Sequence, residues 1–270
     1  MSHAAHLEPV SASEPPELHD DEAAPPGKAP SGRALRTAIE ELNERLGTAQ
    51  ALLAASGKQA LLVVLQGRDT AGKDGTIRNV FSACNPQGCR VTSFAAPSGA
   101  ELARDYLWRV HRAVPPRGMI GIFNRSHYED VLAARVRGLV PEAAWSRRFR
   151  HIAEFERMLV DEGTLVLKFF LHVSKEEQRE RLQARLDDPT KHWKFAVGDL
   201  DERKRWDEYQ AAYSAMIAAT GTAWAPWTVV PADSKTHRNL MIATAVAGSL
   251  RKLKLRYPAG DPALANITVP

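Results

Sequence analysis

The sequence contains only two cysteines, Cys84 and Cys89, in a C-x4-C arrangement. There is no second cysteine pair and no histidine beside this one, which argues against both a disulfide framework and a zinc site. The two thiols are therefore expected to be small core side chains of a protein that works in a reducing compartment. We predict a cytoplasmic location.

Long apolar runs are also missing. Nowhere do 18 consecutive apolar residues occur, so a transmembrane helix is not expected and we predict no membrane partner. The N-terminus has no basic segment followed by an apolar core, so a secretory signal peptide is not expected either. With 270 residues, 44% of them hydrophobic and 25% charged, the chain has the composition of a globular protein with one sizeable core.

Charge is distributed unevenly along the chain. Residues 1–31 contain six acidic residues and one basic residue, are rich in Pro, Ser and Ala, and lack apolar periodicity. This composition predicts a disordered tail, followed by a single domain over residues 32–270. The remainder holds 35 basic and 26 acidic residues, which favours an anionic partner without identifying it.

The apolar pattern predicts strands that alternate with helices. Such alternation is typical of an α/β fold with three layers, in which helices cover both faces of a mostly parallel five-stranded sheet. Short apolar runs predict strands at residues 60–66, 90–95, 119–123, 165–173 and 227–231. Helical periodicity is found at residues 33–55, 73–83, 99–113, 127–137, 141–161, 175–186, 200–219 and 234–256.

A glycine-rich loop directly follows the first predicted strand and opens onto a helix. Its sequence, GRDTAGKDG at residues 67–75, contains the G-x4-G-K core that lets backbone amides approach phosphate oxygens. The order of strand, loop and helix predicts a P-loop in which Lys73 offsets the charge of the phosphoryl group in transit. The other residues predicted to surround the phosphate are Gly67, Arg68, Thr70, Ala71, Gly72, Asp74 and Gly75.

Two aspartates distinguish this loop from a common P-loop. Asp74 replaces the Ser or Thr that normally follows the lysine and holds Mg²⁺, and Asp69 lies inside the loop. A carboxylate in a phosphate site repels the ligand unless a cation lies between them, so Asp69 is predicted to bind magnesium or to activate the acceptor. Its alternative is a bond to its own loop backbone. For Asp74, a helix cap and a place near the metal are equally open.

Further segments extend the pattern beyond the P-loop, from about residue 35 to residue 257. The segments that resemble the motifs of the polyphosphate kinase 2 family, in the right order and spacing, are LQGRDTAGKDGTIR at 65–78, NPQGCRV at 85–91, FNRSHYEDV at 123–131 and RLDDPTKHWKF at 185–195. APW at 225–227 and VPAD at 230–233 are also similar to that family.

This resemblance implies more than the residue pattern alone, which stops at a P-loop kinase. It implies a thymidylate-kinase-like fold with a helical lid at about residues 179–205, and phosphoryl transfer between inorganic polyphosphate and adenine or guanine nucleotides. It also implies dependence on Mg²⁺, with Mn²⁺ as a second candidate ion, a homo-oligomer (dimer or tetramer) and no nucleic-acid partner. Asn124 stands where many members have aspartate, and this version of the motif resembles the subgroup that uses both AMP and ADP.

The second of these motifs follows the third predicted strand, at the carboxyl edge of the sheet where α/β folds bind ligands. Arg125 suits bidentate bonds to phosphate oxygens, and its alternative is a surface ion pair. His127 either donates to phosphate or caps a helix. Glu129 is a predicted magnesium ligand, with a helix-N-terminal acid as its alternative. Asn124 is expected among the nucleotide and polyphosphate contacts.

Basic residues of the lid are predicted to close over the transferring phosphoryl group. A solvated helix face is the ordinary explanation for such a run, but Pro189 and Trp193 interrupt the helical pattern and indicate a loop. Basic side chains that close over the site would stabilise the negative charge that is spread over the transferring phosphoryl group, and would exclude water. The predicted lid contacts are Arg185, Lys191 and Lys194, and Arg78 and Lys168 are candidates for a track along a long polyanion.

Two rival functions differ from this prediction. An ATP-dependent nucleoside monophosphate kinase would share the fold, but its P-loop normally ends in Lys-Ser or Lys-Thr, and Asp74 argues against it. A non-catalytic polyanion-binding module suits the basic charge but leaves Asp69 and Glu129 unexplained in a phosphate site. The sequence therefore predicts a polyphosphate-dependent nucleotide phosphotransferase with Asp69, Lys73 and Arg125 as catalytic residues.

Overall fold

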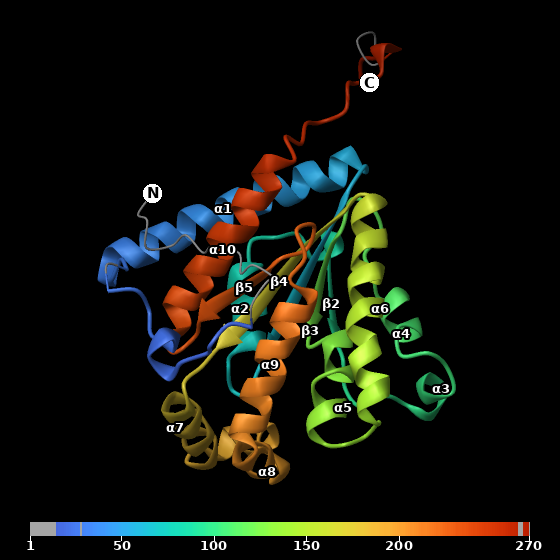
Figure 1. The fold of residues 1–270 in the computed structure, drawn as a ribbon. Coiled ribbons are helices and arrows are strands. Elements are labelled where there is room, and N and C mark those ends of the chain that lie inside the picture. Colours follow the sequence, from blue (N-terminus) through green and yellow to red (C-terminus); the bar gives the residue numbers. More distant parts are fainter. Residues whose placement is uncertain (1–14, 28, 264–266, 270) are drawn as a thin grey trace.

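A sheet of five parallel strands forms the centre of the fold in a computed structural model, which describes residues 15–27, 29–263 and 267–269. The strands lie in the order β2-β3-β1-β4-β5, so the first strand of the chain is in the middle (Figure 1). They are β1 (Ala60–Gly67), β2 (Cys89–Ser93), β3 (Ile120–Asn124), β4 (Thr164–His172) and β5 (Trp227–Pro231). The predicted α/β class with a five-stranded parallel sheet is confirmed.

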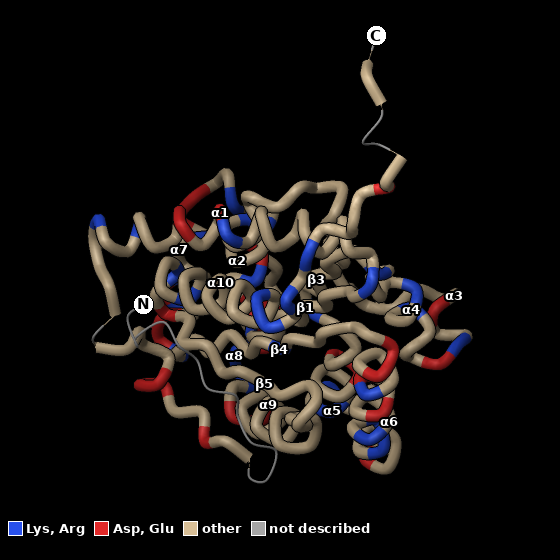
Figure 2. The backbone as a smooth tube through the Cα atoms, turned by 90° about the horizontal axis from the view of Figure 1, so that it is seen from above, with Lys and Arg blue, Asp and Glu red and all other residues tan. Residues whose placement is uncertain are grey.

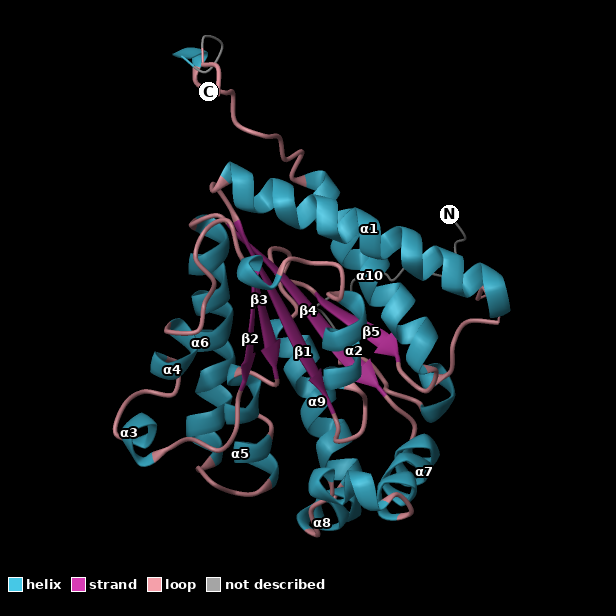
Figure 3. Ribbon diagram, turned by 180° about the vertical axis from the view of Figure 1, so that it is seen from behind, coloured by secondary structure: helices cyan, strands magenta, loops and turns pink. Residues whose placement is uncertain are grey.

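Helices cover both faces of the sheet, as Figures 1 and 3 show. On one face lie α1 (Gly32–Ser56), α2 (Lys73–Val80) and α10 (Lys235–Lys252), and on the other lie α6 (Glu142–Asp161) and α9 (Trp206–Thr220). Within the described ranges, none of the helices combines the length and apolar character that a membrane crossing requires. The shorter segments are α3 (Gly99–Leu102), α4 (Trp108–His111), α5 (Ala133–Val136), α7 (Lys175–Leu186), α8 (Gly198–Lys204) and the 3-10 turns η2 (Asp20–Ala23), η3 (Pro86–Gly88), η4 (His127–Asp130) and η5 (Pro189–Lys194).

The central strand is buried on both sides. Because side chains alternate along a strand, Leu61 and Val63 point into the core beneath α1 and α10, while Leu62 and Val64 point into the core beneath α6 and α9. All four are fully buried. This two-sided burial sets the register of β1 and holds the loop that follows it over the middle of the sheet.

The carboxyl ends of the strands all point toward one end of the molecule, where α5, α7 and α8 lie (Figure 3). In the register between β1 and β3, Leu65 lies opposite Asn124. The glycine-rich loop after β1 and the motif after β3 therefore leave the sheet side by side. This is the edge at which the sequence places both motifs.

The N-terminal segment differs from its prediction. The first 14 residues lie outside the described residues, but the part from residue 15 packs on the body of the protein. The carbonyl of Leu18 accepts a hydrogen bond from Gln210 Nε2 at 2.9 Å, and the carboxylate of Asp20 accepts one from the backbone N–H of Lys175 at 3.1 Å. The prediction of a disordered tail up to residue 31 did not foresee these contacts, which depend on the tertiary position of α7 and α9 and have no local signal in the sequence.

Two predicted helices are shorter than their apolar pattern suggested. The helix predicted at 99–113 divides into α3 and α4 at a turn where Asp105 accepts a hydrogen bond from the backbone N–H of Leu107 at 3.0 Å. The helix predicted at 127–137 divides into η4 and α5, and the hydroxyl of Ser126 accepts from the backbone of η4. Short polar side chains of this kind offer the backbone an alternative to helical hydrogen bonds.

Candidate functional site

The loop after β1 has the strand–loop–helix arrangement of a P-loop. Gly67, Thr70 and Gly72 have φ angles of 152°, 65° and 99°, so the chain turns sharply three times before α2 begins at Lys73. A side chain on Gly72 would collide with the guanidinium of Arg238, which lies directly beneath the loop. Glycine is required there because the backbone and this arginine approach so closely.

Two buried arginines hold the loop from below. Arg181 of α7 donates to the carbonyl of Thr70 at 2.9 Å, and Arg238 of α10 donates to the carbonyl of Ala71 at 2.9 Å. These bonds satisfy the carbonyl oxygens of Thr70 and Ala71 and hold the loop from the side of α7 and α10. Sequence reasoning included Arg181 only within the basic lid run and missed Arg238, because each lies in a helix far along the chain from the loop.

Arg68 does not serve the phosphate site with its side chain, although it was predicted among the residues around the phosphate. Its Nη2 donates to the carbonyl of Trp206 at 2.6 Å and to Gln210 at 2.9 Å. The guanidinium also lies 3.6 Å from the centroid of the Trp206 ring, in a cation–π contact. Burial lowers the pKa of Arg68 to about 10. The side chain therefore ties the loop to α9.

Lys73 is buried at the start of α2. Its Nζ donates to the carbonyl of Gly67 at 2.7 Å and to that of Arg68 at 3.1 Å, so the ammonium lies within the curve of the loop. Burial, assisted by the charge of Arg125 and opposed by Asp69, lowers the pKa of Lys73 to about 8. A cation that is so poorly hydrated interacts strongly with an incoming anion.

The two motifs meet through direct side-chain contacts. Asp69 of the glycine-rich loop accepts a hydrogen bond from Nη2 of Arg125 at 2.6 Å, and Asp74 accepts one from Nδ2 of Asn124 at 2.6 Å. Burial acts to raise the pKa of Asp69, but the charges of Lys73 and Arg125 outweigh it and hold that pKa below its ordinary value. Asp69 is therefore ionised at neutral pH and bonds to the second motif, not to its own loop.

Glu129 of the second motif lies beside the Asp69–Arg125 pair, and the amide of Gln66 at the end of β1 connects it to Ser126 of the same motif. In the orientation that satisfies both amide atoms, Gln66 donates to Glu129 Oε1 at 3.1 Å and accepts from the hydroxyl of Ser126 at 3.0 Å. Burial raises the pKa of Glu129 above its ordinary value, against the opposing charges of Arg125 and nearby Lys73. A cation would keep this carboxylate ionised.

Asp69 and Glu129 have the oxygen donors that suit magnesium. The described residues contain no group of three or more His, Cys, Asp and Glu side chains that could hold a metal ion by themselves. Magnesium commonly binds one or two carboxylates and completes its shell with water and substrate phosphates, so a pair of carboxylates beside a phosphate loop fits it.

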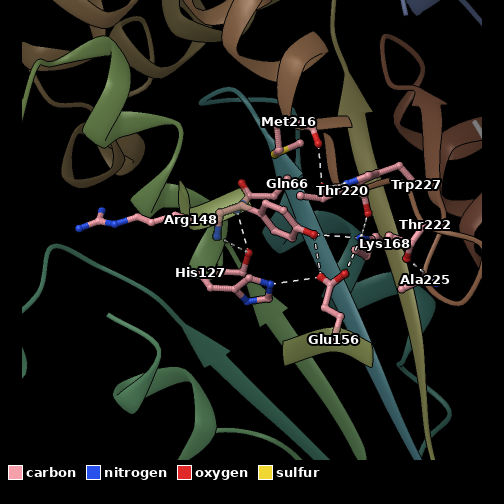
Figure 4. A network of polar contacts seen from close by, with 12 residues as sticks. Gln66, His127, Arg148, Glu156, Lys168, Met216, Thr220, Thr222, Ala225 and Trp227 are labelled. Atoms are coloured by element: carbon pink, nitrogen blue, oxygen red, sulfur yellow. Dashed lines mark hydrogen bonds and ion pairs between the residues drawn. The ribbon is translucent and has the colours of Figure 1, made fainter. Parts of the chain in front are cut away.

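Two predicted contacts with phosphate are wrong, because the side chains point into the interior (Figure 4). Lys168 of β4 is fully buried, and its Nζ donates to Glu156 Oε2 at 2.6 Å and to the carbonyl of Thr220 at 2.7 Å. His127 is also fully buried, with Nε2 3.2 Å from Glu156 Oε1. A lysine in an apolar strand indicates an internal ion pair at least as well as it indicates a contact with bound polyphosphate.

A cavity of about 300 Å³ opens beside the Asp69–Arg125 ion pair. Its polar end is formed by Asp69, Arg125 and Glu129. Its remaining wall combines apolar side chains, arginines and tyrosines with Gln178 and the acidic residues Asp130, Asp199 and Glu202. Sequence reasoning did not identify that wall, because its members come from segments that are far apart in the chain. Among them are Phe94, Leu102, Ala133, Val140, Arg109, Arg137, Arg148, Tyr209 and Tyr213.

The lid region consists of α7, η5 and α8, beyond the carboxyl ends of the strands. Arg185 donates to the carbonyl of Lys194 at 2.9 Å, and its charge helps to lower the pKa of Asp69, after the larger effects of burial, Lys73 and Arg125. Lys191 is half exposed and pairs with Asp188 at 2.8 Å. The structure thus brings Arg185 near the site and leaves Lys191 and Lys194 on the lid surface. Arg78 is exposed in the last turn of α2.

Comparison with known proteins finds relatives that match most of the chain. The sequence model of the polyphosphate kinase 2 family matches residues 31–257. The AMP/ADP-polyphosphate phosphotransferase of Meiothermus ruber is 54% identical over 237 residues, which are 88% of this chain and 89% of that protein. The ADP-polyphosphate phosphotransferase of Rhodopseudomonas palustris is 46% identical over 241 residues, which are 85% of this chain and 82% of that protein.

A solved structure agrees with these relatives. The crystal structure of polyphosphate kinase 2 from Arthrobacter aurescens TC1 matches with a TM-score of 0.87 at 39% identity, and the match covers 96% of this chain and 97% of that chain. The predicted P-loop kinase fold is thereby confirmed. Because the family match covers most of the sequence and carries both motifs, the chain belongs to the polyphosphate kinase 2 family.

Proposed function

We propose that this protein transfers phosphoryl groups between inorganic polyphosphate and nucleotides, and forms ADP from AMP and ATP from ADP. The observation that carries the proposal is the junction of the two motifs, where Asp69 of the P-loop bonds to Arg125 at 2.6 Å beside the buried Lys73. Relatives that share most of the chain are named for this chemistry. We also propose a cytoplasmic homo-oligomer.

The cavity beside the ion pair is the proposed site of the nucleotide. Its volume of about 300 Å³ is at the lower end of the range for small-molecule sites, and its apolar wall suits a flat base. The phosphates would then lie at the polar end, near Asp69 and Arg125. A preference for AMP as well as ADP is proposed because the motif begins with Asn124 instead of aspartate, and because the Meiothermus ruber relative is named for both.

The residues of this chain contribute to phosphoryl transfer mainly by positioning and by charge. Lys73 and the loop amides bind oxygens of the group in transit, and Arg125 donates to phosphate while its bond to Asp69 orients the guanidinium. Mg²⁺ held by Asp69 and Glu129 would neutralise charge that gathers on the phosphate oxygens, and Mn²⁺ is the alternative ion. No covalent intermediate is needed, because the terminal phosphate oxygens are already mostly ionised at neutral pH.

The lid is proposed to close over the same phosphates. Arg185 already lies close enough to influence the charge of Asp69, and rotation of η5 toward the loop would bring Lys191 and Lys194 with it. Closure of this kind adds cations and excludes water, which would otherwise compete with the nucleotide as acceptor.

The proposed reaction is tested by supplying its reactants separately. Purified protein with polyphosphate and Mg²⁺ is expected to yield ATP from ADP, and both ADP and ATP from AMP, as measured by anion-exchange chromatography. The control omits polyphosphate and supplies AMP together with ATP. An ATP-dependent monophosphate kinase would still convert AMP and ATP to ADP under these conditions. If ADP is phosphorylated but AMP is not, the acceptor range is limited to ADP. If neither nucleotide is phosphorylated, the proposed function is wrong.

The pH dependence of the reaction should report the buried lysine. The pKa of Lys73 is about 8 without ligand, so the ammonium is lost as the pH rises through that value. We expect kcat/KM, which reflects the free enzyme, to fall above about pH 8. The fall in kcat should begin at higher pH, because bound phosphate stabilises the ammonium. Identical basic limbs for both parameters, or none up to pH 10, would contradict this role for Lys73.

A further inference from the structure

A network of buried polar side chains lies directly behind the second motif (Figure 4). Glu156 of α6 accepts at Oε1 a hydrogen bond from the hydroxyl of Tyr128 at 2.7 Å, and the same oxygen lies 3.2 Å from His127 Nε2. Its other oxygen lies 2.6 Å from Nζ of Lys168. All four residues are fully buried. Burial of so many polar groups is costly unless each finds a partner.

Lys168 acts within the network as an internal counter-ion. Its three N–H groups are all engaged, because Nζ also donates to the hydroxyl of Tyr128 at 2.9 Å and to the carbonyl of Thr220 at 2.7 Å. Burial acts to raise the pKa of Glu156, but Lys168 and the hydrogen bond from His127 outweigh it and hold that pKa below its ordinary value. Glu156 therefore remains a charged acceptor for both motif residues.

The placement of Glu156 is unusual for its helix. Charged residues of both signs occur along α6 (Figure 2), and most of them belong to the solvent-facing surface of the helix. Glu156 is the charged residue of α6 that is turned fully inward, among Ile152, Phe155 and Leu159. An apolar residue would fill this position without the desolvation cost of a buried charge. The contact with the second motif is what the carboxylate provides and an apolar residue could not.

The second motif has two faces. Arg125 and Glu129 line the cavity, whereas His127 and Tyr128 point to the opposite side and reach Glu156. The reversal begins at Arg125, whose φ of 60° lies in the left-handed region. A non-glycine residue keeps such a conformation only where the surrounding structure enforces it. The hydrogen bonds to Glu156 fix His127 and Tyr128, the second and third residues after the reversal.

We propose that Glu156 is a positioning residue, which holds Arg125 and Glu129 at the cavity through His127 and Tyr128, with Lys168 as its counter-ion. The inference rests on the proposed roles of Arg125 and Glu129 in the reaction. Glu156 touches neither the cavity nor the P-loop among the contacts of the described residues. Its effect on the rate must therefore pass through the geometry of the motif.

A matched pair of double variants separates positioning from stability. Glu156→Gln with Lys168→Met removes both buried charges but keeps an amide oxygen that accepts from Tyr128. Glu156→Leu with Lys168→Met also removes both charges and leaves no acceptor. Neither variant contains an unpaired buried ion, and replacement of a buried ion pair by neutral groups is often tolerated. Thermal unfolding and circular dichroism establish that each protein is folded at the assay temperature.

We expect the Leu/Met variant to lower kcat by about thirtyfold, because a displacement of reactive groups by about 1 Å can cost up to a hundredfold. KM for polyphosphate should change little, since the P-loop is intact. The Gln/Met variant should remain within about threefold of the native kcat. In an Arg125→Ala background, exchange of Glu156 and Lys168 for Leu and Met should cause a smaller loss than in the native protein, because the part of the effect that passes through Arg125 is already absent.

Three outcomes would overturn the proposal. Equal kcat values for the folded Leu/Met and Gln/Met variants would show that the acceptor has no positioning role. Additive losses with Arg125→Ala would show that Glu156 does not act through that arginine. If the Leu/Met variant does not fold, Tyr128→Phe decides, since it removes a single hydroxyl. Its kcat should fall about fivefold at unchanged KM, and a native kcat would refute the proposal. If Arg125→Ala itself retains native kcat, the proposed function of the motif fails instead.

Discussion

Replacement of Lys73 by methionine is expected to lower kcat by a factor of about 10² to 10³. Methionine keeps most of the length of the side chain but removes the charge that lies within the curve of the loop, 2.7 Å from the carbonyl of Gly67. The loss should appear in kcat, measured as initial rates at saturating polyphosphate and nucleotide, because the charge on the transferring group spreads as the transition state forms.

The control for this substitution is Lys58→Met. Lys58 is an exposed lysine just before β1, at the amino end of the strand whose carboxyl end carries the P-loop. It therefore tests the loss of a lysine charge without a change at the site. The circular dichroism spectrum of Lys73→Met must match that of the native protein. A native rate in a folded Lys73→Met variant would exclude the lysine from catalysis.

Asp69→Asn is expected to cause a loss of about 10²-fold or more in kcat, together with a higher Mg²⁺ concentration for half-maximal rate. The amide has the shape of the carboxylate but not its charge, so it binds a divalent ion weakly. It also turns a charge-assisted bond to Arg125, 2.6 Å long in the native protein, into a neutral one. Rates measured over a Mg²⁺ titration distinguish weak metal binding from the weakened bond to Arg125. Excess Mg²⁺ restores only the part of the rate that is lost through weak metal binding.

Asp161→Asn provides the matched control. Asp161 is exposed at the end of α6 and pairs only with its helical neighbour Arg157 among the contacts of the described chain, so its exchange should leave the rate and the Mg²⁺ dependence unchanged. If Asp69→Asn showed a native rate at every Mg²⁺ concentration, the carboxylate would be a structural part of the loop and the proposed metal site would be wrong.

The strands and the P-loop were predictable because their signals are local. An apolar run such as that of β1 is readable within eight residues, and the glycine spacing of the loop is readable within nine. The second motif was placed at the same edge of the sheet because parallel strands share their carboxyl end. Its pairing with the loop, Asp69 with Arg125 and Asp74 with Asn124, follows from that adjacency but needed coordinates to be seen.

The remaining site residues depend on tertiary structure. A buried arginine in a helix and an exposed one look alike in a sequence, so the roles of Arg181 and Arg238 beneath the loop had no local signal. Lys168 and His127 show the same limitation in the opposite direction, because their residue types suggested phosphate contacts while the fold turned them inward. Glu156, their shared partner, lies in a helix whose other charged residues give no hint of it.

The bonds beneath the phosphate loop also affect when this site can fold during synthesis of the chain. Arg181 and Arg238 reach the loop from positions 111 and 167 residues further along the chain than the carbonyls that they bind. A ribosome that has finished the glycine-rich segment has therefore not yet made either of its supports. The nascent chain therefore cannot complete both sets of bonds beneath the loop until α10 has emerged from the exit tunnel.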